Sequence, residues 1–246
     1  MRAPYADRMV VRACAPIPAG SEVLIAYVTA DADPADRNKV FKSFFHDKGC
    51  PCPLCESDRH DGPENLALRA KLVEQFTRLD SAVKALKPFD CQASVAEKRA
   101  EMLALVAALE ATYSSPREAG AVKPDLVEPY HSLAELYPPG DAASFRESVA
   151  YDLKALDAAG AVVKRRENGV VVVVRVPVCA KGLATPILLR ISSRLEACGT
   201  AAEKKEAKEW TRAGLKMQRL LEGADKKVFE TRNGKLLEEL GLTGLV

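Results

Sequence analysis

The segment Gly49-Cys50-Pro51-Cys52-Pro53-Leu54-Cys55 places three thiols within six residues. Cys52 and Cys55 are separated by two residues, which is the spacing with which two thiolates clamp one Zn²⁺ around a tight turn, and Cys50 is near enough to reach the same ion. The two prolines pre-bend the backbone and reduce the entropy that is lost when the site closes. We therefore predict a zinc site at Cys50, Cys52 and Cys55, in a segment too compact and proline-rich to be helix or strand.

These three thiolates leave one position of a tetrahedral zinc site open. His60 follows Cys55 by five residues and could fold back toward the ion. Cys14 lies on a predicted strand that could pass near the same place. Both residues are therefore candidates for the fourth ligand.

The other cysteines, Cys14, Cys91, Cys179 and Cys198, are scattered singly along the chain. We predict that they are small buried hydrophobic residues. The total of seven is odd, and no apolar secretory segment follows the first residues. Both observations argue against a secreted disulfide scaffold, so we expect an intracellular protein of the nucleus or cytoplasm.

The composition is that of an ordinary globular chain: 48% of the 246 residues are apolar, 28% are charged, and the formal net charge is +2. Such a nearly neutral chain gives no global electrostatic argument for nucleic acid or for a membrane surface. No run approaches the ~18 apolar residues of a membrane span. Lys204, Lys205 and Lys208 alternate with glutamates, as on a solvated helix face.

The start of the chain predicts a small β-unit followed by a helix. Residues 8–14 and 22–28 have the apolar character of strands, and Ile17-Pro18-Ala19-Gly20 between them suits a turn. We expect these strands to pair antiparallel. Asp33 is a suitable N-cap and Pro34 a suitable first residue for a helix that runs to about Phe45.

After Gly62-Pro63 the spacing of the apolar residues becomes helical. Ser94 and Glu97 form a capping-box pattern at the start of the second of these helices. Asn168-Gly169 between two apolar runs predicts a β-hairpin with strands at 161–165 and 170–176. The predicted helices span 64–86, 94–113, 126–137, 142–159, 182–198, 201–222 and 225–240.

Together these elements predict an α+β fold with two domains. Residues 1–61 would form a small β-rich unit with the zinc knuckle, and residues 62–246 a mainly α-helical domain with the hairpin inserted near 161–176. Helices paired around short loops suggest helical hairpins like those of a tetratricopeptide array. Because no 34-residue repeat is found, a non-repetitive helical domain is the favoured interpretation.

Residues 8–58 resemble the end of a SET domain and its post-SET segment. The residues that carry the resemblance are Val10-Val11-Arg12-Ala13, then Ile17-x-Ala-Gly20-x-Glu22-Val23-x-Ile25-x-Tyr27, then a helix, then Cys50-x-Cys52-x-x-Cys55. The family pattern is a strand ending in Val-Arg-Ala, followed by Ile-x-x-Gly-Glu-Glu-Leu-x-x-x-Tyr. The match covers about a fifth of the chain. It is most similar to SET-and-MYND-like protein-lysine methyltransferases, which have helical C-terminal regions.

The resemblance implies transfer of a methyl group from S-adenosylmethionine to a lysine of a protein substrate. Positioning and electrostatics supply most of the catalysis in such a reaction. The resemblance assigns the catalytic hydroxyl to Tyr27, which would otherwise be an ordinary strand aromatic. It assigns no cofactor-binding residue, because the chain contains neither the Gly-x-Gly nor the Asn-His-Ser-Cys segment of the family.

Three departures from the family pattern affect this expectation. The cysteine of Asn-His-Ser-Cys is the family's usual fourth zinc ligand, so the resemblance places that ligand outside this chain. Lys48 stands where a post-SET aromatic would pack on the cofactor, and its charge would repel the sulfonium. Ser21 replaces the first Glu of Gly-Glu-Glu. We therefore expect a methyltransferase fragment that binds S-adenosylmethionine weakly or not at all on its own.

The alternative function is that of a non-catalytic, zinc-stapled helical scaffold that binds partner proteins. A zinc-ribbon nucleic-acid binder is disfavoured, because it usually has a second cysteine pair and a basic face that bears aromatic residues. The sequence carries no direct signal for nucleic acid and none for a membrane partner.

Overall fold

The structure of the protein is a computed structural model. It describes residues 2–5, 8–11, 13, 16–21, 28–45, 49–85, 92–113, 121–137 and 142–244. The described helices are α1 (Pro34–Phe45), α2 (Pro53–Lys84), α3 (Gln92–Ala111), α4 (Pro124–Glu135), α5 (Ala142–Ala158), α6 (Lys181–Cys198), α7 (Ala201–Glu222) and α8 (Lys226–Glu239). The strands are β1 (Arg2–Tyr5), β2 (Arg8–Val11), β3 (Val162–Arg165) and β4 (Val171–Arg175). None of the described helices combines the length and the apolar character that crossing a membrane requires.

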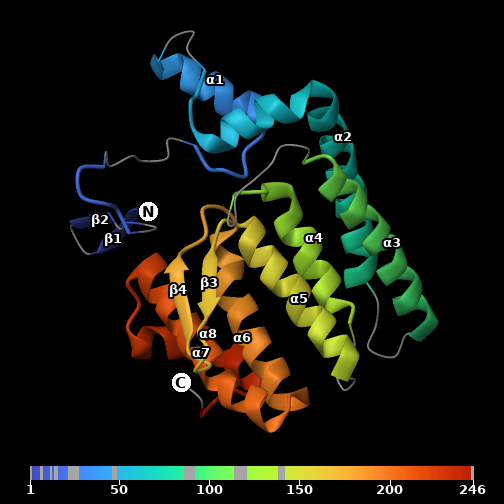
Figure 1. The fold of residues 1–246 in the computed structure, drawn as a ribbon, viewed down its shortest axis with the longest axis vertical. Helices are drawn as coiled ribbons and strands as arrows, with labels where there is room; N and C mark the ends of the chain where they lie inside the picture. The colour runs from blue at the N-terminus through green and yellow to red at the C-terminus, as the bar shows by residue number, and fades with distance from the viewer. Residues whose placement is uncertain are drawn as a thin grey trace.

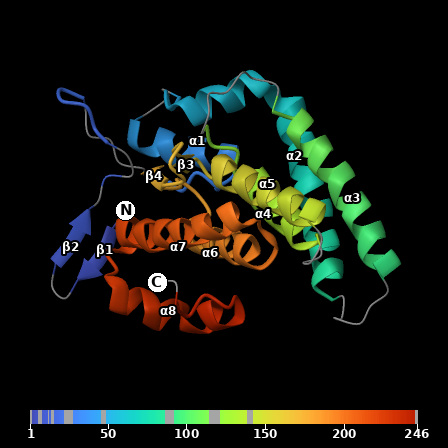
Figure 2. The same ribbon diagram turned by 60° about the horizontal axis from the view of Figure 1, so that its bottom comes forward.

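Successive helices pack side by side as pairs, with α2 against α3, α4 against α5, and α6 against α7. Figures 1 and 2 show the α2–α3 pair on one flank, the α4–α5 pair in the middle, and the α6–α7 pair on the other flank beside the β3–β4 hairpin. The predicted mainly helical character of the chain after residue 62 is confirmed.

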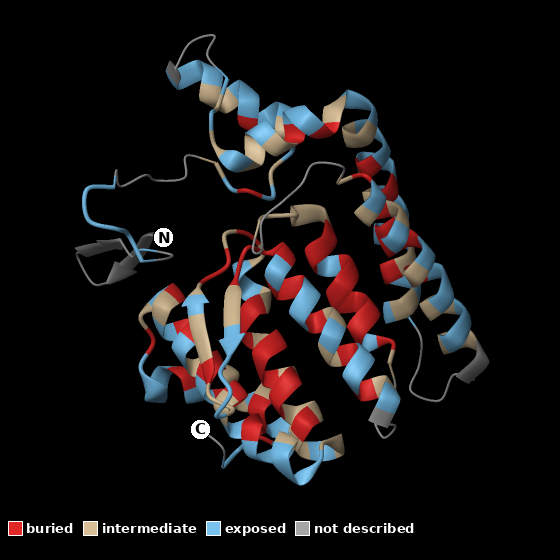
Figure 3. Ribbon diagram, in the orientation of Figure 1, coloured by how far each residue is buried: buried red, intermediate tan, exposed pale blue. Residues whose placement is uncertain are grey.

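The main hydrophobic core lies among α4, α5, α6 and α7, where the buried residues in Figure 3 gather. Leu133 of α4, Ala155 of α5 and Leu188 of α6 have no exposed surface. A smaller core joins α8 to α6, because Phe229 and Leu237 of α8 pack with Leu189 of α6. These packed faces explain why the helical spacing in the sequence predicted most helix bounds to within about two residues.

The N-terminal strand prediction is confirmed in part. β2 lies inside the predicted strand 8–14 and pairs antiparallel with β1, with Arg2 opposite Val11. The sequence analysis did not predict β1. Residues 22–27 of the second predicted strand, including Tyr27, lie outside the described residues, so the predicted pairing of 8–14 with 22–28 stays a prediction.

The hairpin prediction at 161–176 is confirmed. β3 and β4 pair antiparallel, and the amide of Arg166 donates to the carbonyl of Val170 at 2.9 Å across the turn. Only Gly169 of the Asn-Gly pair adopts a positive φ, of 81°. The four consecutive valines of β4, at 171–174, are accommodated because β4 pairs with β3 and packs against α7, which buries Val171.

The expectation that the cysteine segment is neither helix nor strand is wrong, because α2 begins at Pro53 and its first turn includes Cys55. Proline suits this place, since the first amides of a helix have no intrahelical acceptor. The predicted break at Gly62-Pro63 is present as a kink: Gly62 has φ 82° and ψ 165° inside α2. The predicted helix at 64–86 thus continues directly from a helical stretch that begins at Pro53.

Helix starts agree with the sequence prediction at Asp33 and differ from it at Ser94. The Asp33 carboxylate accepts from the amide of Ala35 at 2.7 Å, as an N-cap does. Helix α3 begins at Gln92, so Ser94 lies inside its first turn and the predicted capping box there is wrong. Gln and Ala are both good helix formers, which lets the helix start two residues earlier.

Candidate metal centre

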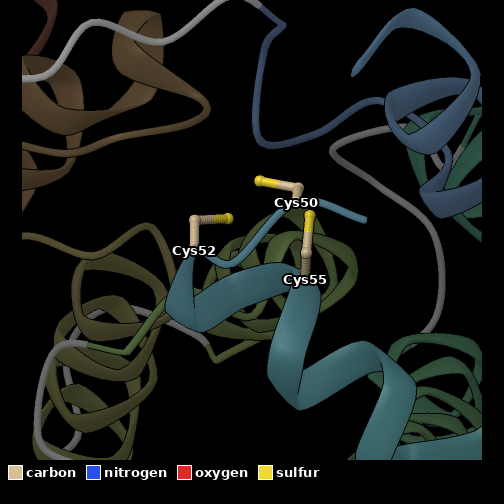
Figure 4. Close-up of side chains that lie close together, drawn as sticks. All are labelled: Cys50, Cys52 and Cys55. Atoms are coloured by element: carbon tan, nitrogen blue, oxygen red, sulfur yellow. The ribbon is translucent and has the colours of Figure 1, made fainter. Parts of the chain in front are cut away.

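The three clustered cysteines come together at the start of α2. Cys50 lies just before the helix, Cys52 is the N-cap residue with an extended backbone (φ −69°, ψ 150°), and Cys55 lies in the first turn. Their sulfur atoms all lie within 4.8 Å of one another, and each residue is half-buried. Figure 4 shows the three side chains converging on one space beside the helix end.

This arrangement fits a zinc ion. Zn–S bonds of ~2.3 Å in a tetrahedral site place sulfur atoms about 3.8 Å apart. The sulfur atoms of the three cysteines lie within 4.8 Å of one another here, so they must move closer by about an ångström to bind one ion. Rotation of the cysteine side chains supplies a movement of this size. Thiolates are soft ligands that favour zinc over hard, oxygen-seeking cations such as Mg²⁺ and Ca²⁺. The Cys50, Cys52 and Cys55 cluster can therefore hold a metal ion such as zinc.

The protein environment distinguishes Cys52 from Cys55. Partial burial opposes ionisation of Cys52, but the nearby amide of Cys55 and the thiols of Cys50 and Cys55 outweigh it, so the pKa of Cys52 is lowered. Burial and the adjacent Cys52 raise the pKa of Cys55 to about 12. Cys52 thus offers the first thiolate to a metal, and Cys55 must release a proton when it coordinates.

Arg37 of α1 fixes the helix end that carries the cluster. Its guanidinium donates to the carbonyl oxygens of Ala30, at 3.0 Å, and Ala32, and it forms a buried ion pair with Asp58 of α2. It also lies close enough to Cys55 to favour the thiolate form of that residue. Arg37 therefore couples α1, α2 and the candidate metal centre.

Arg69 extends this network toward α3 and α4. Its guanidinium pairs with Asp61 at 2.8 Å and with Asp58 at 3.5 Å. It also donates from Nε to the hydroxyl of Thr112 at 3.0 Å and from Nη2 to the carbonyl of that residue at 2.8 Å. The same group lies 3.6 Å from the ring centre of Tyr113, whose hydroxyl donates to Asp125 at 3.1 Å. Buried polar contacts thus connect the start of α2 to the end of α3 and the start of α4.

The other predicted site residues are not brought to the cluster. His60 is exposed on α2 and does not belong to the group of converging ligand atoms. Cys14 and Tyr27 lie outside the described residues, as does Cys91. Cys179 is buried as predicted, whereas Cys198 is only half-buried.

A second polar cluster, which the sequence analysis missed, joins α4, α5 and α6. His131 Nδ1 lies 3.0 Å from Asp152 Oδ1, and His131 Nε2 lies 2.9 Å from Nη1 of Arg190. Arg194 also pairs with Asp152, which has no exposed side-chain surface. Because a guanidinium only donates, Nε2 accepts and Nδ1 carries the proton. Both ring nitrogens are engaged by side chains of neighbouring helices, so the cluster links α4, α5 and α6.

Signals for this second cluster were weak in the sequence. His131, Asp152 and Arg190 lie far apart along the chain, and only the packing of three helices brings them together.

No model of a known protein family, no curated protein and no solved structure matches the chain.

Proposed function

We propose that this chain is the C-terminal part of a SET-type protein-lysine methyltransferase whose post-SET cysteines, Cys50, Cys52 and Cys55, bind a structural zinc ion. The observation that carries the proposal is the convergence of the three sulfur atoms at the start of α2. The zinc ion would fix the position of α2 relative to the segment that precedes it. The helices that follow would form the helical C-terminal region of such an enzyme.

The surroundings of the cluster support a structural role for the metal. Metal binding supplies folding free energy because the unfolded chain does not hold the ligands in place. Here that free energy would be applied at the junction where Arg37 and Arg69 already connect α1, α2, α3 and α4. Loss of the metal should therefore loosen the N-terminal half of α2 more than the α6–α7 pair.

Zinc content and limited proteolysis test this part of the proposal. The chain purified without chelator should hold one zinc ion, and the Cys52→Ser/Cys55→Ser variant should hold none. The variant should be cleaved faster between residues 49 and 62. Cys179→Ser is the control, because that thiol is buried and does not belong to the converging ligand group. Equal zinc content in the three proteins would refute the assigned ligands.

The methyltransferase part of the proposal rests on the order of the SET-like motifs, the knuckle and the helices. In such an enzyme the target lysine must be neutral and in line with the methyl group, so catalysis depends on positioning. The resemblance gives the catalytic hydroxyl to Tyr27. An Asn-His-x-Cys segment encoded in frame upstream of Met1 in the genome would support this part of the proposal.

The protein expressed from that longer frame should transfer labelled methyl groups from S-adenosylmethionine to lysines of protein substrates. Tyr27→Phe should lower the rate by orders of magnitude. Tyr137→Phe should not, because that ring packs on Tyr151 in the helical domain. Lack of transfer by the longer protein, or full activity of Tyr27→Phe, would refute the assignment.

The second candidate function is that of a zinc-stapled helical scaffold without catalysis. The polar clusters of the described helices favour this scaffold function. The polar groups of the Arg69 and His131 networks find their hydrogen-bond partners within the protein. Calorimetry discriminates the two functions: a scaffold would bind a partner protein but not S-adenosylmethionine, even in the longer form of the chain.

A further inference from the structure

The exposed face of α7 is basic over most of its length, between Lys204 and Arg219. Between residues 204 and 219 of this helix, every exposed position is occupied by lysine or arginine. We call these six residues the basic stripe: Lys204, Lys205, Lys208, Arg212, Lys216 and Arg219. At 100° per residue they fall within an arc of about 120°, and at 1.5 Å per residue they extend over about 22 Å.

The glutamates that alternate with these residues in the sequence are directed elsewhere in the structure. Glu203 forms the capping box with Thr200 and pairs with Arg146 at 3.4 Å. Glu206 is buried and pairs with Arg165 at the hairpin. Glu222 pairs with Arg232 of α8. The lysines are exposed as predicted, but most of the glutamates that alternate with them pair with other elements instead of neutralising the face.

Only one member of the basic stripe is neutralised by a neighbour, because Glu209 pairs with Arg212. The described part of the chain gives the other five no ion-pair partner: Lys204, Lys205, Lys208, Lys216 and Arg219. Five free cations on one helix face are a strong local field in a chain whose formal net charge is only +2.

We propose that the basic stripe of α7 binds the phosphate backbone of a nucleic acid without reading its sequence. No apolar side chain of the exposed class lies along the stripe, and Leu215, within its arc, is half-buried against the smaller core, so the stripe lacks a large hydrophobic centre of the kind at the core of protein–protein interfaces. Successive cations at i and i+4 are about 6 Å apart along the helix axis. A 22 Å length of duplex carries about six phosphates on each strand, which matches six cations in number.

The residue types fit this partner. Five lysines or arginines without competing carboxylates act as point charges toward phosphates, which positions a protein on a duplex without specifying bases. The stripe contains no asparagine, glutamine or aromatic side chain that could read base edges or stack on bases. The proposal is independent of the zinc site, since no residue of the stripe belongs to the cysteine cluster at the start of α2.

Fluorescence anisotropy of a labelled duplex of arbitrary sequence tests the proposal. For five released counterions, log K should fall with log salt concentration with a slope of about −4.5, a loss of about 500-fold between 50 and 200 mM salt. The variant with Lys204, Lys205, Lys208 and Lys216 changed to Gln should keep one free cation. Its slope should be about −0.9, a loss of only about fourfold over the same range.

The control carries the same charge change on other helices, with Lys39, Lys42, Lys71 and Arg78 changed to Gln. It should bind the duplex as the unchanged protein does. Glutamine is a good helix former and all eight positions are exposed, so both variants should keep their helical circular dichroism. Equal weakening in the two variants, absence of duplex binding, or stronger binding of a poly-glutamate peptide than of the duplex would overturn the proposal.

Discussion

Replacing Arg69 by Met should destabilise the protein by about 3–5 kcal/mol, which is the usual cost of removing one partner from a buried ion pair. Arg69 is 4% exposed, and its guanidinium faces Asp61, whose side chain has no exposed surface. Methionine keeps the unbranched aliphatic stem of the side chain but supplies no charge and no donor for Thr112. The loss would therefore be electrostatic and not a cavity effect.

Urea unfolding followed by circular dichroism, at saturating zinc, measures this change. Arg78→Met on the same helix is the control, because Arg78 and its partner Glu74 are 80% and 72% exposed and 3.8 Å apart. Such a surface pair contributes at most about 1 kcal/mol, so the control should stay within about 0.5 kcal/mol of the unchanged protein.

A double-mutant cycle with Asp61→Asn isolates the pairing of the two charges. Removing both charges should cost less than the sum of the single changes by about 1–3 kcal/mol, since the second change no longer leaves a charge facing a neutral group. Strictly additive costs, or an Arg69→Met variant as stable as Arg78→Met, would refute the reasoning that the buried ion pair between Arg69 and Asp61 stabilises the protein.

Three further predictions concern the kink, a buried thiol and metal affinity. Gly62→Ala should destabilise the protein by about 1–3 kcal/mol in urea unfolding, because the backbone conformation at this position, φ 82° with ψ 165°, is open only to glycine. Gly234→Ala is the control and should stabilise the protein slightly, because Gly234 lies in a helix and a Cβ there would meet no neighbour. A gain in stability for Gly62→Ala would contradict the kink. Cys179 should resist iodoacetamide at pH 8, because burial raises its pKa to about 12 and leaves only about 10⁻⁴ of the thiol as thiolate. The labelling rate of Cys179, followed by mass spectrometry, should rise about tenfold per pH unit. Rapid labelling at pH 8 would show that the thiol is exposed. Zinc affinity, measured by chelator competition, should rise at least about tenfold per pH unit between pH 6 and 8, because Cys55, with a pKa of about 12, must lose its proton to bind the metal. An affinity that does not depend on pH would exclude Cys55 as a ligand.

Local sequence signals predicted most of the helical part of the fold. The spacing of apolar residues located α4 to α7 because one face of each helix is buried in the main core, and α8 because its apolar face is buried in the smaller one. Asn168-Gly169 located the hairpin because a tight turn requires the positive φ that Gly169 adopts. The start of α2 was missed because the metal-binding spacing of the cysteines coincides with a helical turn that begins at Pro53.

The sequence predicted the ligands of the candidate metal centre but not the residues that support them. Cys50, Cys52 and Cys55 are close in sequence, so their convergence is a local property. The Arg69–Thr112 contact spans 43 residues, and the His131–Arg190 contact spans 59. Such contacts depend on how helices pack, and a single sequence without tertiary information does not reveal them. The same limit explains why the basic face of α7 looked mixed in the sequence.

X-ray absorption spectroscopy at the zinc edge tests the central claim most directly, because it reports the ligand atoms of the bound ion and their distances. The account predicts at least three sulfur ligands at about 2.3 Å in the unchanged protein. Cys52→Ser should remove one of them, and Cys179→Ser should remove none. A zinc ion surrounded only by nitrogen and oxygen, or a sulfur count that Cys52→Ser leaves unchanged, would contradict the assignment of Cys50, Cys52 and Cys55 as a zinc knuckle.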